Sequence, residues 1–188
     1  MTEFAIGQIT STEENADRIV QLVRQDLLTA GLTTDEILRY AYPSVEFQRN
    51  RLADNPERYL GAYALSGDEL AGFIAHNEWL RGDQADFEPS ATKRKLQRIL
   101  ARVGLNHLNN RPHGIFGLVV SDTVENGDDV ADLLLRGVID LAKGREIRIA
   151  QYPGDSVEPV LRDNGFYPTG EFGIVVGLRQ QLYVRDAS

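Results

Sequence analysis

Cysteine is absent from this chain of 188 residues, and methionine and tryptophan occur only once each. Without cysteine the chain can form no disulfide, no thiolate nucleophile and no cysteine metal site. Long apolar runs are also lacking, since no stretch approaches the roughly 20 residues that a membrane-spanning helix needs. The start, Met1–Phe4, has neither the basic residues nor the apolar segment of a signal peptide. We therefore expect a cytoplasmic protein with no membrane partner.

Positive charge is scarce, because 20 lysine and arginine residues face 28 aspartate and glutamate residues, for a formal net charge of −8. Proteins that bind nucleic acid usually present a basic face to the phosphates, so we expect no nucleic-acid partner. The negative net charge also repels other polyanions, so binding of a phosphate group would depend on the local geometry of its site. The length and the 42% share of hydrophobic residues fit a single globular domain spanning residues 1–188.

Several familiar motifs are missing as well. The chain has no phosphate loop of the Gly-x-x-x-x-Gly-Lys type, no Gly-x-Gly-x-x-Gly fingerprint and no Gly-x-Ser-x-Gly nucleophile elbow. Its three histidines, His76, His107 and His113, show no metal-ligand spacing, so we expect no metal site and interpret them as loop or surface residues.

Apolar spacing at the start of the chain predicts a strand at residues 4–9 followed by a helix. The helix is expected to begin at Ser11, a cap residue with Glu14 three positions later, and to end at Gly31. Two shorter helical pieces are expected between residues 34 and 55. The apolar face of the first helix consists of residues at helical spacing, namely Ile19, Leu22, Val23 and Leu27.

The middle of the chain predicts two strands, at residues 59–65 and 70–80, joined by the turn Ser66–Glu69. So short a connection makes the two strands antiparallel. Residues 82–113 break the pattern, and we interpret them as a helical insertion that holds one amphipathic helix, Ser90–Leu108. Its basic side is either a solvated face or a patch for an acidic ligand. The basic residues are Lys93, Arg94, Lys95, Arg98 and Arg102.

The last third of the chain predicts a strand at 115–120, a helix at 130–141 and a strand at 147–152. Strand, helix and strand over this length imply a parallel pair with a right-handed crossover. A short helix at 156–164, which Gly165 ends, and a last strand or hairpin at 172–184 follow. The apolar edge of that last strand could pair with a second copy of the chain as a homodimer.

This order of elements resembles the GNAT superfamily of N-acetyltransferases. The resemblance is clearest from Ile115 to Phe172, where Leu161–Phe166 is similar to the short family helix that ends in Gly-Phe. It implies an α/β (α+β) fold with a mixed central sheet and helices on both faces. It also implies acetyl-coenzyme A (acetyl-CoA) as co-substrate.

In the GNAT superfamily, the pantetheine arm of acetyl-CoA lies between two strands that splay apart, and pairs with the backbone of the first. The resemblance assigns this role to Leu118, Val119 and Val120. These residues would serve equally well in an ordinary core strand.

The diphosphate is held in this superfamily at a helix N-terminus, in the pattern Arg/Gln-x-x-Gly-x-Gly/Ala. Free amide groups and small residues there let an anion approach. Two positions depart from the pattern, because Asn126 replaces the first residue and Asp129 the central glycine. Acidic residues in a first helical turn also stabilise a helix without any ligand. The matching stretch consists of Asn126, Gly127, Asp128, Asp129, Val130 and Ala131.

Catalysis by such enzymes needs a base for the amine and an acid for the leaving thiolate. The family's tyrosine acid is replaced by Leu161, and Tyr152 is the candidate substitute, although it would also fit a strand-end core position. Glu78 is the candidate base, since alternation puts it on the same strand face as His76. The alternative is a polar stripe that faces solvent.

We therefore expect an acetyl-CoA-dependent N-acetyltransferase that acts directly on a primary amine of a small molecule or protein. The alternative is a catalytically inactive GNAT-like domain that binds or interacts. A different acyl group is a third possibility, because pocket shape sets that choice.

Overall fold

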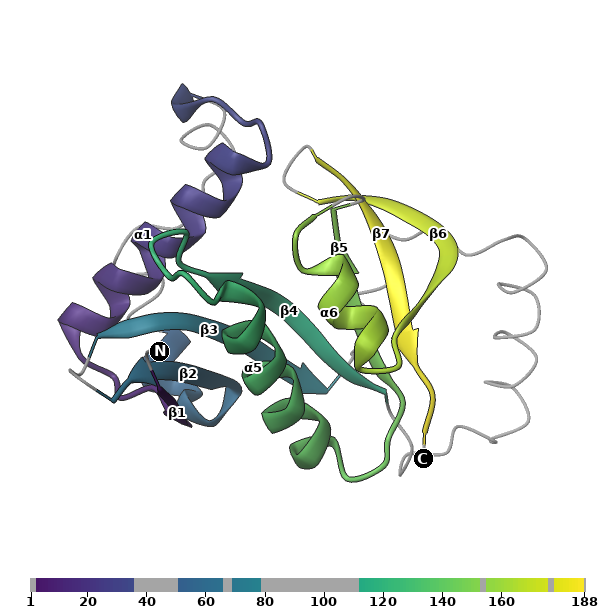
Figure 1. The fold of residues 1–188 in the computed structure, drawn as a ribbon, viewed down its shortest axis with the longest axis horizontal. Helices are drawn as coiled ribbons and strands as arrows, with labels where there is room; N and C mark the ends of the chain where they lie inside the picture. Colours follow the sequence, from purple (N-terminus) through teal and green to yellow (C-terminus); the bar gives the residue numbers. More distant parts are fainter. Residues whose placement is uncertain are drawn as a thin grey trace.

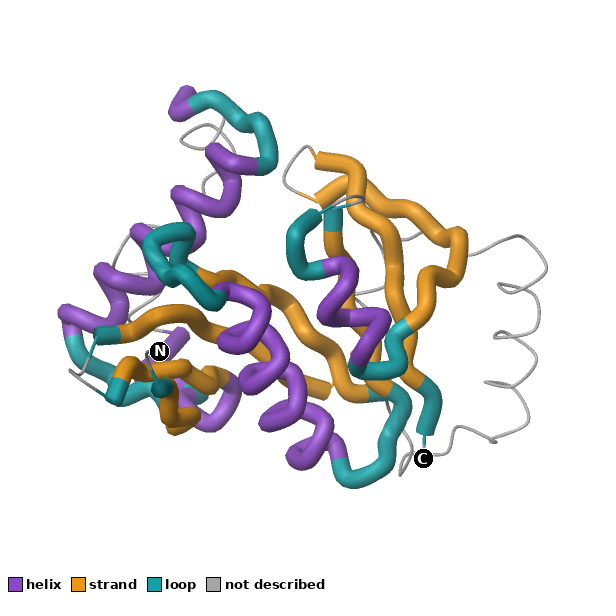
Figure 2. Tube along the Cα trace, in the orientation of Figure 1, coloured by secondary structure: helices purple, strands orange, loops and turns teal. Residues whose placement is uncertain are grey.

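A computed structural model describes residues 3–35, 51–65, 69–78, 112–152, 155–175 and 178–187 of the chain. Figures 1 and 2 show one mixed sheet with helices packed against it. The elements are β1 (Phe4–Gln8), α1 (Glu13–Thr29), the 3₁₀ turn η1 (Pro56–Arg58), β2 (Tyr59–Ala64), β3 (Leu70–Glu78), β4 (His113–Val120), α5 (Gly127–Ala142), β5 (Ile147–Gln151), α6 (Glu158–Asp163), β6 (Tyr167–Val175) and β7 (Leu178–Arg185).

The seven strands lie in the order β1-β2-β3-β4-β5-β7-β6. Only β4 and β5 run parallel, and every other neighbouring pair is antiparallel. Helices α5 and α6 share one apolar core with one face of the sheet, whereas α1 packs into a separate core on the other face. The predicted mixed sheet with helices on both faces is therefore confirmed.

Helix α1 begins one residue later than the sequence predicts. Thr12 rather than Ser11 is its cap, because Thr12 has an extended backbone and its hydroxyl accepts a hydrogen bond from the amide of Asn15 at 3.2 Å. Gly31 follows the helix with a φ of +95°, as a helix exit requires. The predicted apolar residues of this helix are all buried against the sheet.

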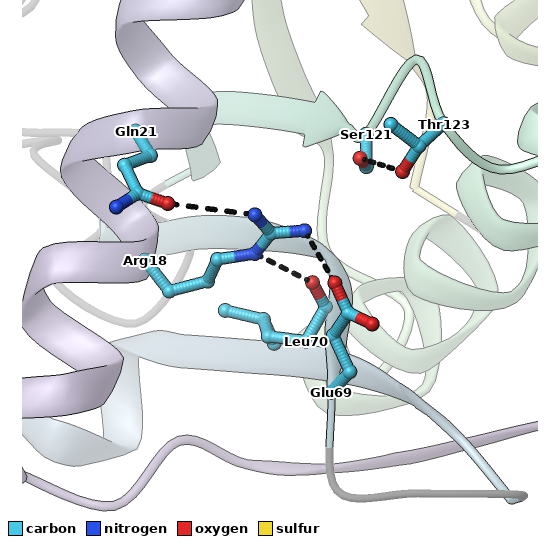
Figure 3. Close-up of polar contacts among 6 residues, drawn as sticks. All are labelled: Arg18, Gln21, Glu69, Leu70, Ser121 and Thr123. Carbon is cyan, nitrogen blue, oxygen red and sulfur yellow. Dashed lines mark hydrogen bonds and ion pairs between the residues drawn. The ribbon is translucent and has the colours of Figure 1, made fainter.

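A guanidinium group joins α1 to the hairpin end of β3 (Figure 3). Arg18 donates to the carbonyl of Leu70 at 3.3 Å and forms an ion pair with Glu69 at 2.9 Å. In the same view, the hydroxyls of Ser121 and Thr123 are hydrogen-bonded at 2.8 Å in the loop that leaves β4. The amide of Ser121 also donates to the carbonyl of Ala71 at 2.8 Å. These contacts hold the end of β4 in place next to β3 and α1.

The hairpin at the end of the chain corrects one expectation. The last strand, β7, is paired with β5 on one side and β6 on the other, so it has no free edge for a second copy. Strand β6 is at the edge of the sheet instead. Homodimer formation stays a prediction, but pairing through the edge of the last strand no longer supports it.

Two expected features fall outside the described residues: the insertion with its Ser90–Leu108 helix, and most of the helical pieces after residue 35. Within the part of the chain that is described, no helix combines the length and apolar character needed to cross a membrane.

Two histidines that were expected at the surface are instead buried side by side. His76 of β3 and His113 of β4 are 7% and 5% exposed, and their ring centroids lie 5.0 Å apart. Arg145 can only donate, so the 3.2 Å contact makes Nδ1 of His113 an acceptor. Nε2 of His113 then carries the proton and donates to Nδ1 of His76 at 3.0 Å. Arg145 thus donates to His113, and His113 donates to His76. Both imidazole rings must be neutral for these two hydrogen bonds to exist together.

Burial lowers the pKa of both histidines, and the charges of His76 and Arg145 help to bring the pKa of His113 to about 4. In the unfolded chain, His113 takes up a proton near pH 6.5. In the native state it does so only near pH 4. We expect the contribution of His113 to the free energy of unfolding to fall as the pH falls through this window. Urea denaturation at several pH values should show a smaller fall for His113→Gln than for the wild type. Parallel curves would contradict the assignment.

A glycine in β3 is required by close packing. A Cβ at Gly72 would lie 2.8 Å from the carbonyl oxygen of Val119, a backbone atom that cannot rotate away. We expect Gly72→Ala to lower the free energy of unfolding by about 1–3 kcal/mol. Gly7→Ala is the matched control, because its Cβ would make only an ordinary contact with Tyr63 at 4.0 Å. Equal urea midpoints for the two variants would show that the strands can separate to accept the methyl group.

Candidate active site

The parallel strands β4 and β5 are paired only where they start. The pairs are His113 with Ile147, Gly114 with Arg148, and Ile115 with Ile149. Beyond them, β5 stays paired with β7, whereas β4 stays paired with β3 through Val120. The sheet therefore divides into two halves, and Figure 1 shows β4 running away from β5.

An irregularity in β4 marks the place where the two strands part. His76 faces Ile115 and Ala75 faces Gly117, so Phe116 is one extra residue in the register of β4 against β3. Such a bulge bends its strand and increases the local twist. It comes directly after the last pair with β5. Among the described strands, none is paired with Gly117–Val120 on the side of β4 that faces β5.

A cavity of about 660 Å³ opens at the end of β4, a volume typical of small-molecule sites. Its walls come from the end of α1, from Val120 and the loop after β4, and from the first turn of α5. On the other side it is closed by Tyr152 after β5, by Asp155–Val157 before α6, and by Arg179 of β7.

The first turn of α5 contributes backbone donors to this cavity. Val130 is the first residue of the helix to bond back, to the carbonyl of Asn126 at 3.3 Å. The amides of Gly127, Asp128 and Asp129 precede it and have no carbonyl partner within the helix. Together with the helix dipole they favour an anion, although the side chain of Asp128 also lines the cavity.

Carboxylates outnumber cations among the described residues that line the cavity. Asp26 from α1, Asp122 and Asp128 meet Asp155 there, and Arg179 is the one basic side chain. The guanidinium of Arg179 lies over the ring of Phe172, 3.9 Å from the ring centre. Burial, and secondly the charge of Asp155, raise the pKa of Asp26 to about 7. Within the described residues, no cluster of three or more metal-binding side chains occurs.

Comparison with known proteins gives a result for the fold alone. No protein-family model matches the chain. No curated protein matches its sequence. Among solved structures, a GNAT-family acetyltransferase from Streptococcus agalactiae 2603 aligns with a TM-score of 0.66 and 17% identity, over 98% of this chain and 96% of its own.

Two further solved structures align with this chain over nearly its whole length. The PaiA N-acetyltransferase from Thermoplasma acidophilum, in complex with coenzyme A, has a TM-score of 0.59 and 16% identity over 98% of this chain and 99% of its own. The ribosomal-protein-alanine N-acetyltransferase from Brucella melitensis has a TM-score of 0.62 and 14% identity over 97% and 99%. The chain has the GNAT fold.

Five of the residues assigned from the GNAT resemblance meet in the cavity. They are Val120, Gly127, Asp128, Ala131 and Tyr152. They come from the end of β4, the start of α5 and the loop after β5, which are far apart in the sequence.

The other assigned residues lie elsewhere. The side chains of Leu118, Val119 and Val130 are buried in the core, so any contact they make with a ligand would come from the backbone. Asn126 lines a neighbouring cavity of about 410 Å³ on the other side of the turn. Asp129 is exposed outside both cavities.

Glu78 is separated from this group in the GNAT fold. Its backbone pairs with His113 at the start of β4, where β4 and β5 are still joined. Seven strand positions separate His113 from Val120, which corresponds to about 23 Å of extended backbone. The side chain of Glu78 lies outside the described residues, and its role as a base stays a prediction.

Three residues of the cavity were not among the site residues expected from the sequence, namely Asp26, Asp155 and Arg179. A signal for Asp26 existed, because it follows Leu22 by four positions and Val23 by three. A carboxylate is thus placed on the apolar side of an amphipathic helix, where it must be buried or line a cavity. Arg179 had no such signal, since only the pairing of β7 with β5 brings it to the cavity.

Proposed function

We propose that this protein is an acetyl-CoA-dependent N-acetyltransferase that acts on a primary amine of a small molecule or a protein. The observation that supports it most is the unpaired stretch of β4 beside a cavity at the N-terminus of α5. Backbone donors and acceptors left without partners in a protein interior are costly. An extended ligand with amide groups of its own would satisfy them as an added strand.

Coenzyme A has the chemistry that this arrangement requires. Its pantetheine arm carries amides that would pair with the backbone of Leu118–Val120, and its diphosphate would meet the free amides of Gly127–Asp129. The acidic lining is unfavourable for the diphosphate, so we expect modest rather than tight affinity.

Little further chemistry is needed from the protein, because the acetyl thioester is itself reactive toward a neutral amine. Tyr152 lines the cavity and is our candidate for the acid that protonates the leaving thiolate. The known fold neighbours include one in complex with coenzyme A and one that acts on a protein, the ribosomal-protein-alanine enzyme. Fold likeness alone does not choose between small-molecule and protein amines.

Binding and turnover can be measured separately. We expect calorimetry to detect acetyl-CoA binding, and a thiol-reactive dye to detect coenzyme A release when a primary amine is added. The protein contributes no background in the second assay because it has no cysteine. Heat without thiol release would favour the inactive binding domain. No heat at millimolar acetyl-CoA would remove the proposed N-acetyltransferase and leave the inactive interaction domain.

The charge of Asp128 gives a more specific prediction. Asp128→Asn should tighten coenzyme A binding by about fivefold, since removing one like charge near a surface is worth on the order of 1 kcal/mol. The same change should lower the stability of the free protein by about 0.3–1 kcal/mol, because the acid in the first turn favours the helix dipole.

Asp140→Asn is the matched control, since Asp140 lies at the opposite end of the same helix. It should leave coenzyme A affinity unchanged in calorimetry. Equal effects of the two variants would show that only the overall charge matters.

A further inference from the structure

The carboxylate of Asp26 has no evident structural role. It comes from the last turn of α1 and lines the same cavity as Tyr152 and Val120. Among the described residues, no hydrogen bond or ion pair involves its side chain. Its backbone carbonyl accepts a hydrogen bond from the amide of Ala30 at 2.9 Å. A half-buried carboxylate without a partner lowers the stability of a fold, and its place in the cavity wall points to a role toward a ligand.

The second carboxylate of the cavity is in the opposite situation. Asp155 accepts hydrogen bonds from Nε2 of Gln151 at 2.6 Å, from the hydroxyl of Ser156 at 3.1 Å and from the amide of Val157 at 3.2 Å. Its oxygens are therefore already engaged by three donors. Asp155 lines the same cavity as Asp26, and its charge acts on the carboxyl of Asp26.

We propose that Asp26 is the general base that accepts the proton of the attacking amine. This inference rests on the proposed function and assigns a residue to its proton-transfer step. The carboxylate reaches the cavity from the α1 side, and Tyr152 reaches it from the β5 side. The base and the candidate acid therefore face one ligand-sized space from opposite walls.

The step balances without any other reactant. The ammonium group of the acceptor gives one proton to the carboxylate of Asp26 and becomes a neutral amine. Its nitrogen forms a bond to the acetyl carbon of the thioester, and the carbon–sulfur bond breaks. The thiolate takes a proton from the Tyr152 hydroxyl, the N–H proton lost by the amide product restores the phenol, and Asp26 returns its proton to solvent.

The charged surroundings of Asp26 suit this role. Burial and Asp155 bring the pKa of Asp26 to about 7, close to the optimum for a base that acts at neutral pH. An incoming cation offsets the repulsion between the two carboxylates, which favours the ammonium form of the acceptor at this wall. The other titratable or charged described groups around the cavity are Asp122, Asp128, Tyr152 and Arg179.

The first experiment compares Asp26→Asn with the wild type in the thiol-release assay. The probes are acetyl-CoA with 1,4-diaminobutane, 2-phenylethylamine and a short peptide with a free α-amino group. We expect kcat to fall by about 100-fold or more, the usual effect of losing a general base. Acetyl-CoA affinity in calorimetry should not fall, because the change removes one of the carboxylates that oppose the diphosphate. Asp17→Asn is the matched control on the same helix, away from this cavity, and should behave as the wild type does.

The pH profile separates a base from a residue that only positions others. In the wild type, kcat/KM should rise with pH through about 7 as Asp26 loses its proton. This limb should vanish in Asp26→Asn. In Asp155→Asn it should move to lower pH, because the charge that raises the pKa of Asp26 is gone.

A readout without turnover uses the stability of the protein. The pKa of Asp26 is raised from 3.8 to about 7, so the native state holds a proton between these pH values that the unfolded state lacks. This group's contribution to stability is therefore present below pH 4 and is lost as the pH rises toward 7. Asp26→Asn should abolish that loss in urea denaturation.

The outcomes distinguish the two proposals. A wild type that releases no thiol with any probe overturns the proposed function, and the role of Asp26 with it. An active wild type with an equally active Asp26→Asn variant overturns the role of Asp26 alone. Turnover that is lost in Glu78→Gln but kept in Asp26→Asn would assign the base to Glu78.

Discussion

The structure depends on how the backbone hydrogen bonds of β4 are distributed. On one side the strand is paired with β3 along its length, and on the other it is paired with β5 only as far as Ile115. The bulge at Phe116 turns the rest of β4 away, and β5 continues with β7. Buried backbone donors and acceptors are costly when they lack partners, so the parting of the two strands is the basis of the proposed coenzyme A binding. The cavity and the start of α5 lie beside the parted end of β4.

Electrostatics around the cavity act in two directions. The amides and dipole at the start of α5 attract an anion, while the carboxylates of Asp26, Asp128 and Asp155 oppose one. The same carboxylates favour a cation, and the proposed amine acceptor would arrive as one at neutral pH. The proposed reaction, with an anionic co-substrate and a cationic acceptor, would need such a division. The anion-binding groups belong to the backbone of α5, and the unbonded carboxylate belongs to α1.

The buried histidine pair serves the closed end of the same strands. His76 and His113 lie where β4 still pairs with β5, beneath the end of α5, where Arg145 donates to His113. A polar chain of this kind is stable only while every ring keeps its tautomer, so it links the β3–β4 pair to the helix as long as the rings are neutral.

The chain by itself determined the elements and their order, because apolar periodicity and turn residues are local signals. The residues Ile19, Leu22 and Gly31 were enough to define α1, and the short turn before β3 was enough to make its pair antiparallel. The resemblance to the GNAT superfamily, rather than the local pattern, placed Gly127 and Ala131 at the helix start, which lies three residues before the start that the pattern predicts. Tertiary structure alone decided that β7 lies inside the sheet, that two histidines meet, and that Asp26 faces Asp155. The physical reason is that strand order, bulge geometry and desolvation arise from contacts between segments far apart in the chain, and local patterns do not record them.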